Sequence, residues 1–270
     1  MTRRSSRAST SSSRGRLADF LVSVLAGLGA GIGVGCGGMS SAVVVTPVLV
    51  TFLHLDAFRA IGVALCADVL ASLASAVVYG KNGNLHPRKA LLLMASVIVF
   101  TIVGTLISRV VTDRSMGGLS VVITLLTGLK LLVRPVTDGR PRPGLTEKRR
   151  VVESIMCGAG VGLVCGFVGA GGGMMMLLVL VTFLGYAMKE AVGTSVFIMT
   201  FTTAVGAIAH FTEFGVPSLW VLIPCVLATL VSAHGTSTLA NRAKPKTLSR
   251  ATGALAVTLA MAVFIFDAVK

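Results

Sequence analysis

Long apolar windows alternate with short basic segments along this chain. The two longest uncharged windows cover residues 20–55 and 154–188, which are 36 and 35 residues long. One helix of that length would measure about 54 Å, far more than the ~30 Å hydrocarbon core of a bilayer. Each window is interrupted by a glycine run, at 35–38 and at 169–173. The pattern therefore predicts, in each window, two helical arms of about 15 residues, or about 22 Å, that meet at a glycine break.

Three plainer apolar spans follow each broken window. They cover residues 57–80, 90–111 and 115–133 in the first half, and 189–212, 217–240 and 248–267 in the second half. No window shows the apolar–polar alternation of a strand, so the sequence predicts an all-α, multi-pass membrane protein. The expected organisation is a disordered basic Ser/Arg-rich tail at 1–16, a first membrane repeat at 17–133, a basic linker at 134–150 and a second membrane repeat at 151–270.

The two halves resemble each other in sequence. The letters TFL at 51–53 recur at 182–184, and the glycine run at 35–38 aligns with that at 169–173. If each broken pair enters and leaves on one side, each half makes an odd number of crossings, and the halves insert in opposite orientations as inverted repeats. Inversion puts the five-arginine tail outside; if each broken pair made one crossing instead, the tail would be cytoplasmic and the 242–250 loop external. The excess length of the windows favours inversion.

Composition and charge agree with a membrane location. Hydrophobic residues make up 54% of the chain and charged residues 13%, and the mean hydropathy is +0.90. Soluble domains carry about 25% charged residues, so a water-soluble globule is excluded. The net charge of +14 is concentrated in the tail, the linker and the segment 242–250. Such basic loops between apolar spans follow the positive-inside rule, which argues against nucleic-acid binding and places the linker and 242–250 on the cytoplasmic side. The expected location is the plasma membrane of a bacterium.

A set of motifs in the second half carries a family resemblance. GAGGGM at 169–174, TFLG at 182–185 and MKEAVGTS at 188–195 resemble the sulfite exporter TauE/SafE family of permeases. The resemblance extends over both halves, from about residue 20 onward, and is stronger in the second. It implies a multi-pass permease for small sulfur-containing anions such as sulfite or sulfoacetate. The first half departs from the pattern, with Cys36 in its glycine run and no third consecutive glycine, so the two halves are not expected to contribute equally to a site.

The glycine breaks are the candidate anion-binding site. Short helices beginning near Met39 and Met174 would place free N–H groups and positive dipole ends inside the membrane, where they bind anions without charged side chains. We expect the two breaks to approach each other near the midplane, and we assign the earlier glycines at 27–33 to helix packing. The predicted substrate-binding residues are Gly35, Gly37, Gly38, Ser40, Ser41, Gly169, Gly171, Gly172, Gly173, Thr194 and Ser195.

Asp68 is the only acidic residue near the middle of a predicted span. Carboxylates inside a membrane are costly and suggest a function, here that of carrying a coupling proton. The alternative is a structural hydrogen bond to Ser72 or to a neighbouring helix. The residue that aligns with Asp68 in the second half is Met199, so the internal repeat predicts no paired acid.

Other functions remain as alternatives. The sequence has no HExxH, GxSxG or P-loop motif, so we predict neither an enzyme nor a cofactor. The sulfur atoms of Cys36, Met39 and Met174–Met176 lie beside the breaks and leave a copper permease open, because soft ligands select Cu(I). A membrane-embedded accessory protein is the other alternative. The expected partners are the lipid bilayer and a small anion, and a homodimer is one option for the oligomeric state.

Overall fold

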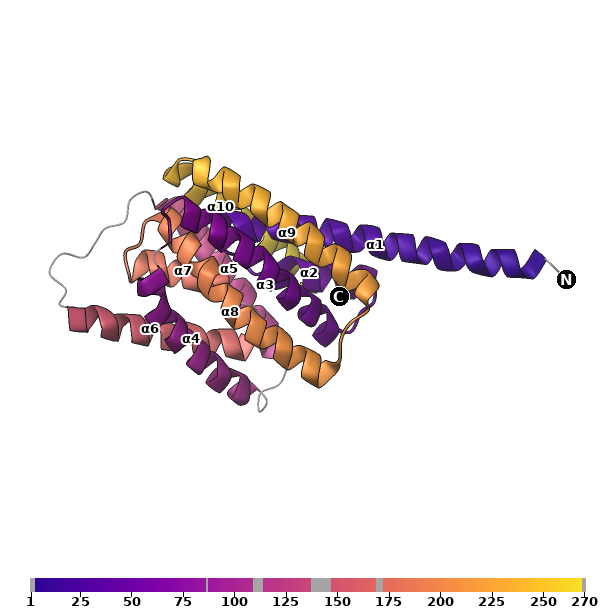
Figure 1. Cartoon of the computed structure of the whole chain (residues 1–270), viewed down its shortest axis with the longest axis horizontal. Helices are drawn as coiled ribbons and strands as arrows, with labels where there is room; N and C mark the ends of the chain where they lie inside the picture. Colours follow the sequence, from indigo (N-terminus) through magenta and orange to yellow (C-terminus); the bar gives the residue numbers. More distant parts are fainter. Residues whose placement is uncertain (1–2, 86, 109–113, 137–146, 169–171, 269–270) are drawn as a thin grey trace.

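The computed structural model describes residues 3–85, 87–108, 114–136, 147–168 and 172–268. Within these ranges the chain forms helices and no strand (Figure 1). The helices are α1 (Arg3–Gly37), α2 (Ala42–Phe52), α3 (Ala57–Lys81), α4 (Pro87–Ser108), α5 (Arg114–Val133), α6 (Glu147–Val168), α7 (Gly173–Thr182), α8 (Met188–Phe214), α9 (Leu219–Arg242) and α10 (Pro245–Ala268).

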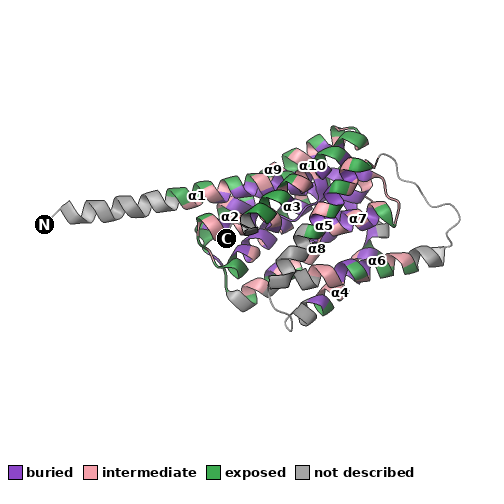
Figure 2. Ribbon diagram, turned by 180° about the vertical axis from the view of Figure 1, so that it is seen from behind, coloured by how far each residue is buried: buried purple, intermediate pink, exposed green. Residues whose placement is uncertain are grey.

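The predicted all-α membrane architecture is confirmed. Each of the six plain spans expected from the sequence has a helix whose ends lie within three residues of the prediction. Among the described residues, five segments are long and apolar enough to cross a bilayer: Leu17–Gly37, Ala57–Lys81, Met188–Thr212, Leu219–Arg242 and Pro245–Ile265. Large apolar side chains cover the outside of the bundle, where Figure 2 shows many exposed positions, among them Leu25, Val231 and Phe264 at 65–67% exposure. An outer surface of this kind suits contact with lipid.

Both predicted helix breaks are present, but their arms are unequal. α1 ends at Gly37 and α2 begins at Ala42, while α6 ends at Val168 and α7 begins at Gly173. The expectation of two equal arms of about 15 residues is wrong. The apolar part of α1 has 21 residues and is long enough to cross the membrane, whereas α2 and α7 have only 11 and 10. The early glycines do not shorten α1, because they lie within a continuous helix that is packed against another helix.

The basic N-terminal segment continues α1 toward the N-terminus. Residues 3–16 form the first turns of α1 and project beyond the bundle (Figure 1). The segment contains no proline and only one glycine, Gly15. Arginine and alanine are good helix formers, so an established helix can extend through it.

The closest helix packing joins the first half to the second. α1 packs along α9, α4 along α6, α3 along both α8 and α9, and α5 along α10. Gly27 and Gly31 of α1 lie against α9, where a Cβ added to Gly31 would be 2.5 Å from the carbonyl oxygen of Thr229. In the α4–α6 pair, a Cβ on Gly162 would be 2.5 Å from the carbonyl oxygen of Val97. Glycine therefore sets the distance between these helices, and the packing role predicted for Gly27 and Gly31 is confirmed.

Hydrogen bonds gather several helix ends at one end of the bundle, which we call the linker end. The Asn84 side chain, after α3, donates to Asn241 Oδ1 at 2.7 Å, and Lys189 Nζ, at the start of α8, donates to the Asn241 carbonyl oxygen at 2.6 Å. The Val136 amide, after α5, donates to Ser249 Oγ of α10 at 3.0 Å. The start of the 134–150 linker, at Val136, and the α9–α10 turn therefore lie at this end. The N-terminal segment of α1 projects from the opposite end (Figure 1).

Candidate functional site

The two glycine breaks lie directly against each other. A Cβ on Gly173 would overlap the carbonyl oxygen of Gly38 and would be 3.0 Å from Met199 Sδ on α8. A Cβ on Gly38 would overlap Ser195 Oγ, also on α8. Gly38 in addition has φ +61°, a left-handed conformation that favours glycine. We call the contact of Gly38 with Gly173, together with the facing turns of α8, the junction.

The junction lies inside the membrane-spanning part of the bundle. Ser195 is seven residues and Met199 eleven residues after the start of α8 at Met188, which corresponds to about 10 and 16 Å along the helix. Gly38, Ser195 and Met199 are all buried. The breaks therefore meet well below the linker end, as the sequence analysis expected.

At the first break, the start of α2 is occupied by the chain's own carboxylate. Asp68 is fully buried on α3. Its Oδ1 accepts a hydrogen bond of 2.7 Å from the Ser41 amide, and its Oδ2 accepts one of 2.6 Å from Ser40 Oγ. Ser41 Oγ donates to the Ala64 carbonyl oxygen at 2.7 Å. The two serines predicted to bind substrate thus hold Asp68 and α3 against the start of α2. Of the two structural partners considered for Asp68, Ser72 or a neighbouring helix, Ser72 is not the one used.

At the second break, the corresponding position carries no charge. The residue that faces Gly173 from α8 is Met199, which aligns with Asp68 in the internal repeat. α7 begins after Gly172, where no described side chain caps the helix, and the first backbone bond of the helix runs from the Met176 amide to the Gly172 carbonyl. The two helix starts therefore differ: α2 receives a carboxylate and α7 faces a thioether.

The remaining predicted site residues fall into four groups. Gly35 packs on α9, where an added Cβ would be 2.6 Å from the Ala233 carbonyl oxygen, and Gly37 packs on Thr252 of α10, so neither lies at the junction contact itself. Ser195 and Thr194 are buried on α8, and Ser195 Oγ donates to the Val192 carbonyl at 2.9 Å. Two further residues, Gly169 and Gly171, lie outside the described residues. Gly172 lies against Cys165 of α6.

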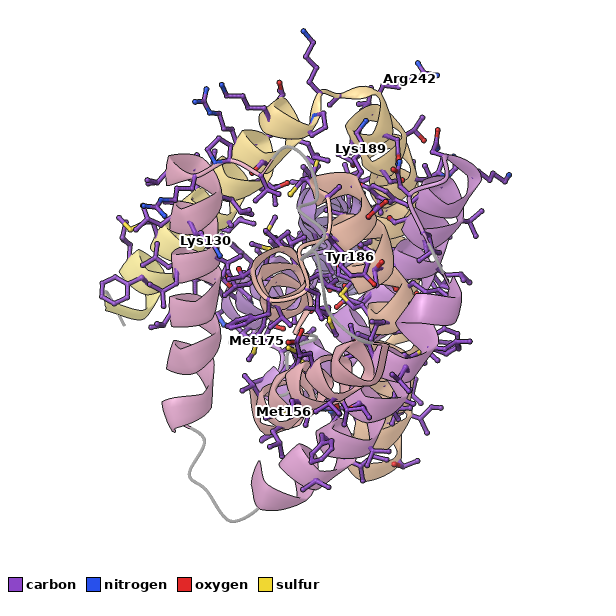
Figure 3. The ribbon with its side chains drawn as sticks, turned by 90° about the vertical axis from the view of Figure 1, so that its left-hand side faces the viewer. Lys130, Met156, Met175, Tyr186, Lys189 and Arg242 are labelled. Carbon is purple, nitrogen blue, oxygen red and sulfur yellow. The ribbon has the colours of Figure 1, made fainter. Side chains whose placement is uncertain are left out.

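The structure adds polar contacts that sequence reasoning missed. Ser72 Oγ of α3 and Thr200 Oγ1 of α8 are 2.9 Å apart, which joins the two halves by a buried hydroxyl pair. Lys130 Nζ of α5 donates to Thr182 Oγ1 at the last residue of α7. Figure 3, viewed from the linker end, shows Lys130 on one side and Lys189 on the other. A lysine within the apolar span 115–133 was a sequence signal for Lys130, because charges inside a span are rare.

The sulfur-rich surroundings of the breaks behave as core. Met39 and Met174 are buried members of one apolar cluster, together with Leu177, Met188 and other side chains. Among the described residues, no group of three His, Cys, Asp or Glu side chains is placed to hold a metal ion. Methionine commonly fills irregular gaps in apolar cores, and the burial of Met39 and Met174 is of this kind.

Comparison with known proteins identifies the family of this chain. A family model described as sulfite exporter TauE/SafE matches residues 23–263, nearly the whole chain and including both breaks, α3 and α8. This chain belongs to the sulfite exporter TauE/SafE family. It is a multi-pass membrane protein of a transporter family, as its apolar helices independently indicate. The same comparisons match this TauE/SafE chain to no curated protein and to no solved structure.

Proposed function

We propose that this TauE/SafE protein is a permease of the cell membrane for a small anion such as sulfite or sulfoacetate, and that the anion binds at the start of α7. The observation that carries the proposal is the difference between the two breaks. One helix start is filled by Asp68, while the other faces Met199. The anion would take, at α7, the position that Asp68 takes at α2.

The chemistry of the first break indicates which class of ligand the second break would bind. At α2 a carboxylate oxygen accepts from the Ser41 amide at a helix start deep in the bundle. The α7 start offers the same kind of group, because the first amides of a helix have no partner within it and the dipole favours negative charge. A carboxylate, a sulfite and a sulfonate all present oxygen acceptors of this type. Because α7 supplies no fixed charge of its own, the ligand must supply the charge.

The packing of the helices supports an inverted-repeat arrangement. Each half contributes five helices, so α1 corresponds to α6 and α4 to α9. The contact of α1 with α9 therefore has its counterpart in the contact of α6 with α4. The α3–α8 and α5–α10 contacts each join a helix to the corresponding helix of the other half. These four pairs are those expected of a two-fold axis, although α3 also packs extensively along α9 while the counterpart pair, α8 and α4, makes little contact. Transporters built from inverted repeats bind substrate at broken helices near such an axis.

We place the linker end on the cytoplasmic side. Lys81, Lys189 and Arg242 lie at this end, together with Val136, at the start of the linker, and the segment 242–250. Basic residues are enriched in cytoplasmic loops. An anion leaving the cell would enter between these cationic groups and move toward the α7 start.

Transport by the purified protein in proteoliposomes tests the function directly. We expect flux of sulfite, sulfoacetate or a related anion that is saturable and independent of any other protein. A protein that moves none of the sulfur anions, sulfate or carboxylates tested would instead support the accessory role. Loading the vesicles on either side gives the direction of transport.

A substitution at Met199 tests the position of the site. Met199→Asp would place a carboxylate beside the α7 start and should abolish anion transport, because the chain's own charge would occupy the site. Met199→Leu, which has nearly the same volume and no charge, should retain transport. Met199→Asn controls for the cost of burying a polar group. Normal transport by a folded Met199→Asp protein would contradict the assignment.

A further inference from the structure

α3 carries a stripe of polar side chains inside the bundle. Asp68, Ser72, Ser75 and Tyr79 are all fully buried, at 0% exposure. Their spacings of four, three and four residues place them on one face of the helix. Polar side chains in the interior of a membrane bundle are retained where they bond to neighbours or line a path for a ligand. Each member of the stripe can be assigned to one of these two cases by its hydrogen bonds.

Three members of the stripe are committed to partners. Asp68 accepts from Ser40 and Ser41 at the first break. Ser72 pairs with Thr200 of α8 at 2.9 Å, and Tyr79 Oη donates to the Gly35 carbonyl oxygen at 3.1 Å. Ser75 differs from them, because its Oγ has no hydrogen-bond partner among the described residues. Buried polar atoms in proteins are nearly always bonded, so an unpaired hydroxyl at this depth calls for a partner such as a water molecule or a ligand; within the described part of the chain, Thr46 and Thr51 of α2 have unpaired hydroxyls as well.

Ser75 lies between the junction and the linker end. It is one helical turn from Ala71, which belongs to the same buried cluster as Met199. Met199 in turn contacts Gly173 at the start of α7. In the other direction, the next member of the stripe is Tyr79, followed by the end of α3 at Lys81, where the linker end begins.

We propose that the Ser75 hydroxyl donates a hydrogen bond to an oxygen of the transported anion as it moves between the linker end and the α7 start. The inference rests on the proposed permease function and names a further contact on the same path. A single neutral donor suits this position, because conduction requires binding that is favourable enough to enter and weak enough to leave. Ser75 is the hydroxyl of the stripe whose hydrogen is not already donated within the described residues.

Cysteine modification tests whether Ser75 faces the path. The five native cysteines are replaced by alanine, and Ser75→Cys is compared with Ala76→Cys, a buried neighbour that packs in the apolar core. The reagent is a small methanethiosulfonate carrying a sulfonate, applied from the linker end. Its reaction with the thiolate forms a mixed disulfide and releases methanesulfinate. We expect modification at position 75 at least tenfold faster than at position 76, and slowed by the transported anion.

Two outcomes would overturn the proposal. One is modification at position 75 as slow as at position 76, and the other is modification that the transported anion does not slow. Transport is measured in parallel with the cysteine-free protein, which keeps Ser75. If that protein transports the anion while position 75 is unreactive or unprotected, the inference about Ser75 is wrong and the permease function stands. If neither the cysteine-free protein nor the native protein transports any of the anions tested, the permease function itself has failed.

Transport kinetics supply a second measurement. Ser75→Ala removes the donor without adding volume, and Ser75→Thr restores a hydroxyl. Because a hydrogen bond to a charged ligand is lost, we expect the half-saturating anion concentration or the maximal rate to worsen roughly tenfold or more in Ser75→Ala. Ser75→Thr should recover most of that loss, which a purely structural role of the side chain would not explain. Unchanged kinetics in folded Ser75→Ala would refute the contact.

Discussion

Replacement of Gly31 by alanine should separate two helices that the structure holds in backbone contact. An added Cβ would be 2.5 Å from the Thr229 carbonyl oxygen, 2.7 Å from Ser232 Cβ and 2.9 Å from the Ala233 amide nitrogen, all on α9. Two of these atoms are backbone, so no side-chain rotation relieves the overlap. Gly29, two residues earlier on α1, is the matched control, because its nearest neighbour would be Val44 Cγ1 at 3.6 Å, an ordinary contact.

The expected magnitude follows from two opposing effects. Both substitutions gain about 1 kcal/mol of helix propensity, because alanine replaces glycine within a helix. Only Gly31→Ala also incurs the cost of overpacking, typically about 1–3 kcal/mol. The free energy of unfolding should therefore be lower in Gly31→Ala than in Gly29→Ala by about 1–3 kcal/mol. At about 2–4 °C per kcal/mol for a large domain, the melting temperatures should differ by roughly 2–12 °C.

Thermal unfolding in detergent measures this difference. The fluorescence of Trp220, the only tryptophan and a residue of α9, can follow it. The native protein and both variants are heated at the same rate and protein concentration. Equal melting temperatures for the two variants would refute the close α1–α9 contact, and a higher value for Gly31→Ala would refute the packing argument altogether.

Three further predictions concern topology and transport. Single cysteines placed in the 134–150 linker and in 242–250 should react with a membrane-impermeant reagent from the cytoplasmic side only; labelling from opposite sides would exclude inverted repeats. Asp68→Asn keeps an acceptor for the Ser41 amide, so this variant should fold. If Asp68 carries the coupling proton, the variant should lose gradient-driven transport and keep counterflow exchange. Normal gradient-driven transport would leave Asp68 a structural role. Gly172→Leu should block transport, since its side chain would overlap Cys165 at the α7 start; normal flux through this variant would argue against the site.

The positions of the breaks could be predicted from the sequence, but the lengths of their arms could not. Glycine runs at 35–38 and 169–173 are local signals, and both lie where a helix stops. The glycines at 27 and 31 look similar in the sequence, yet they remain helical because α9 packs on them. The deciding partner is about 200 residues away along the chain. A window's length therefore could not show how it is divided between its two arms.

The role of Asp68 at the first break was also beyond sequence reasoning. Its position in mid-span was a clear signal, and Ser40 and Ser41 were identified separately as candidates beside the glycine run. The hydrogen bonds that connect them cross a helix break, and the direction taken by the chain after Gly38 decides which residues meet. The internal alignment shows that Met199 takes the place of this acid in the second half. The alignment alone could not show that the two helix starts therefore differ, because it does not place Asp68 at the start of α2.

The packing of α1 on α9 has a consequence for the order in which the protein assembles during synthesis. Gly27 contacts Ala228, 201 residues later, so at about 5–20 residues per second α1 waits roughly 10–40 s for its partner. Gly158 of α6 meets Ser96 of α4 after only 62 residues, or roughly 3–12 s. The α4–α6 pair can therefore form while the second half is still being made. During that interval the glycine face of α1 is not covered by α9. If translation stops before α9 is made, this face stays uncovered.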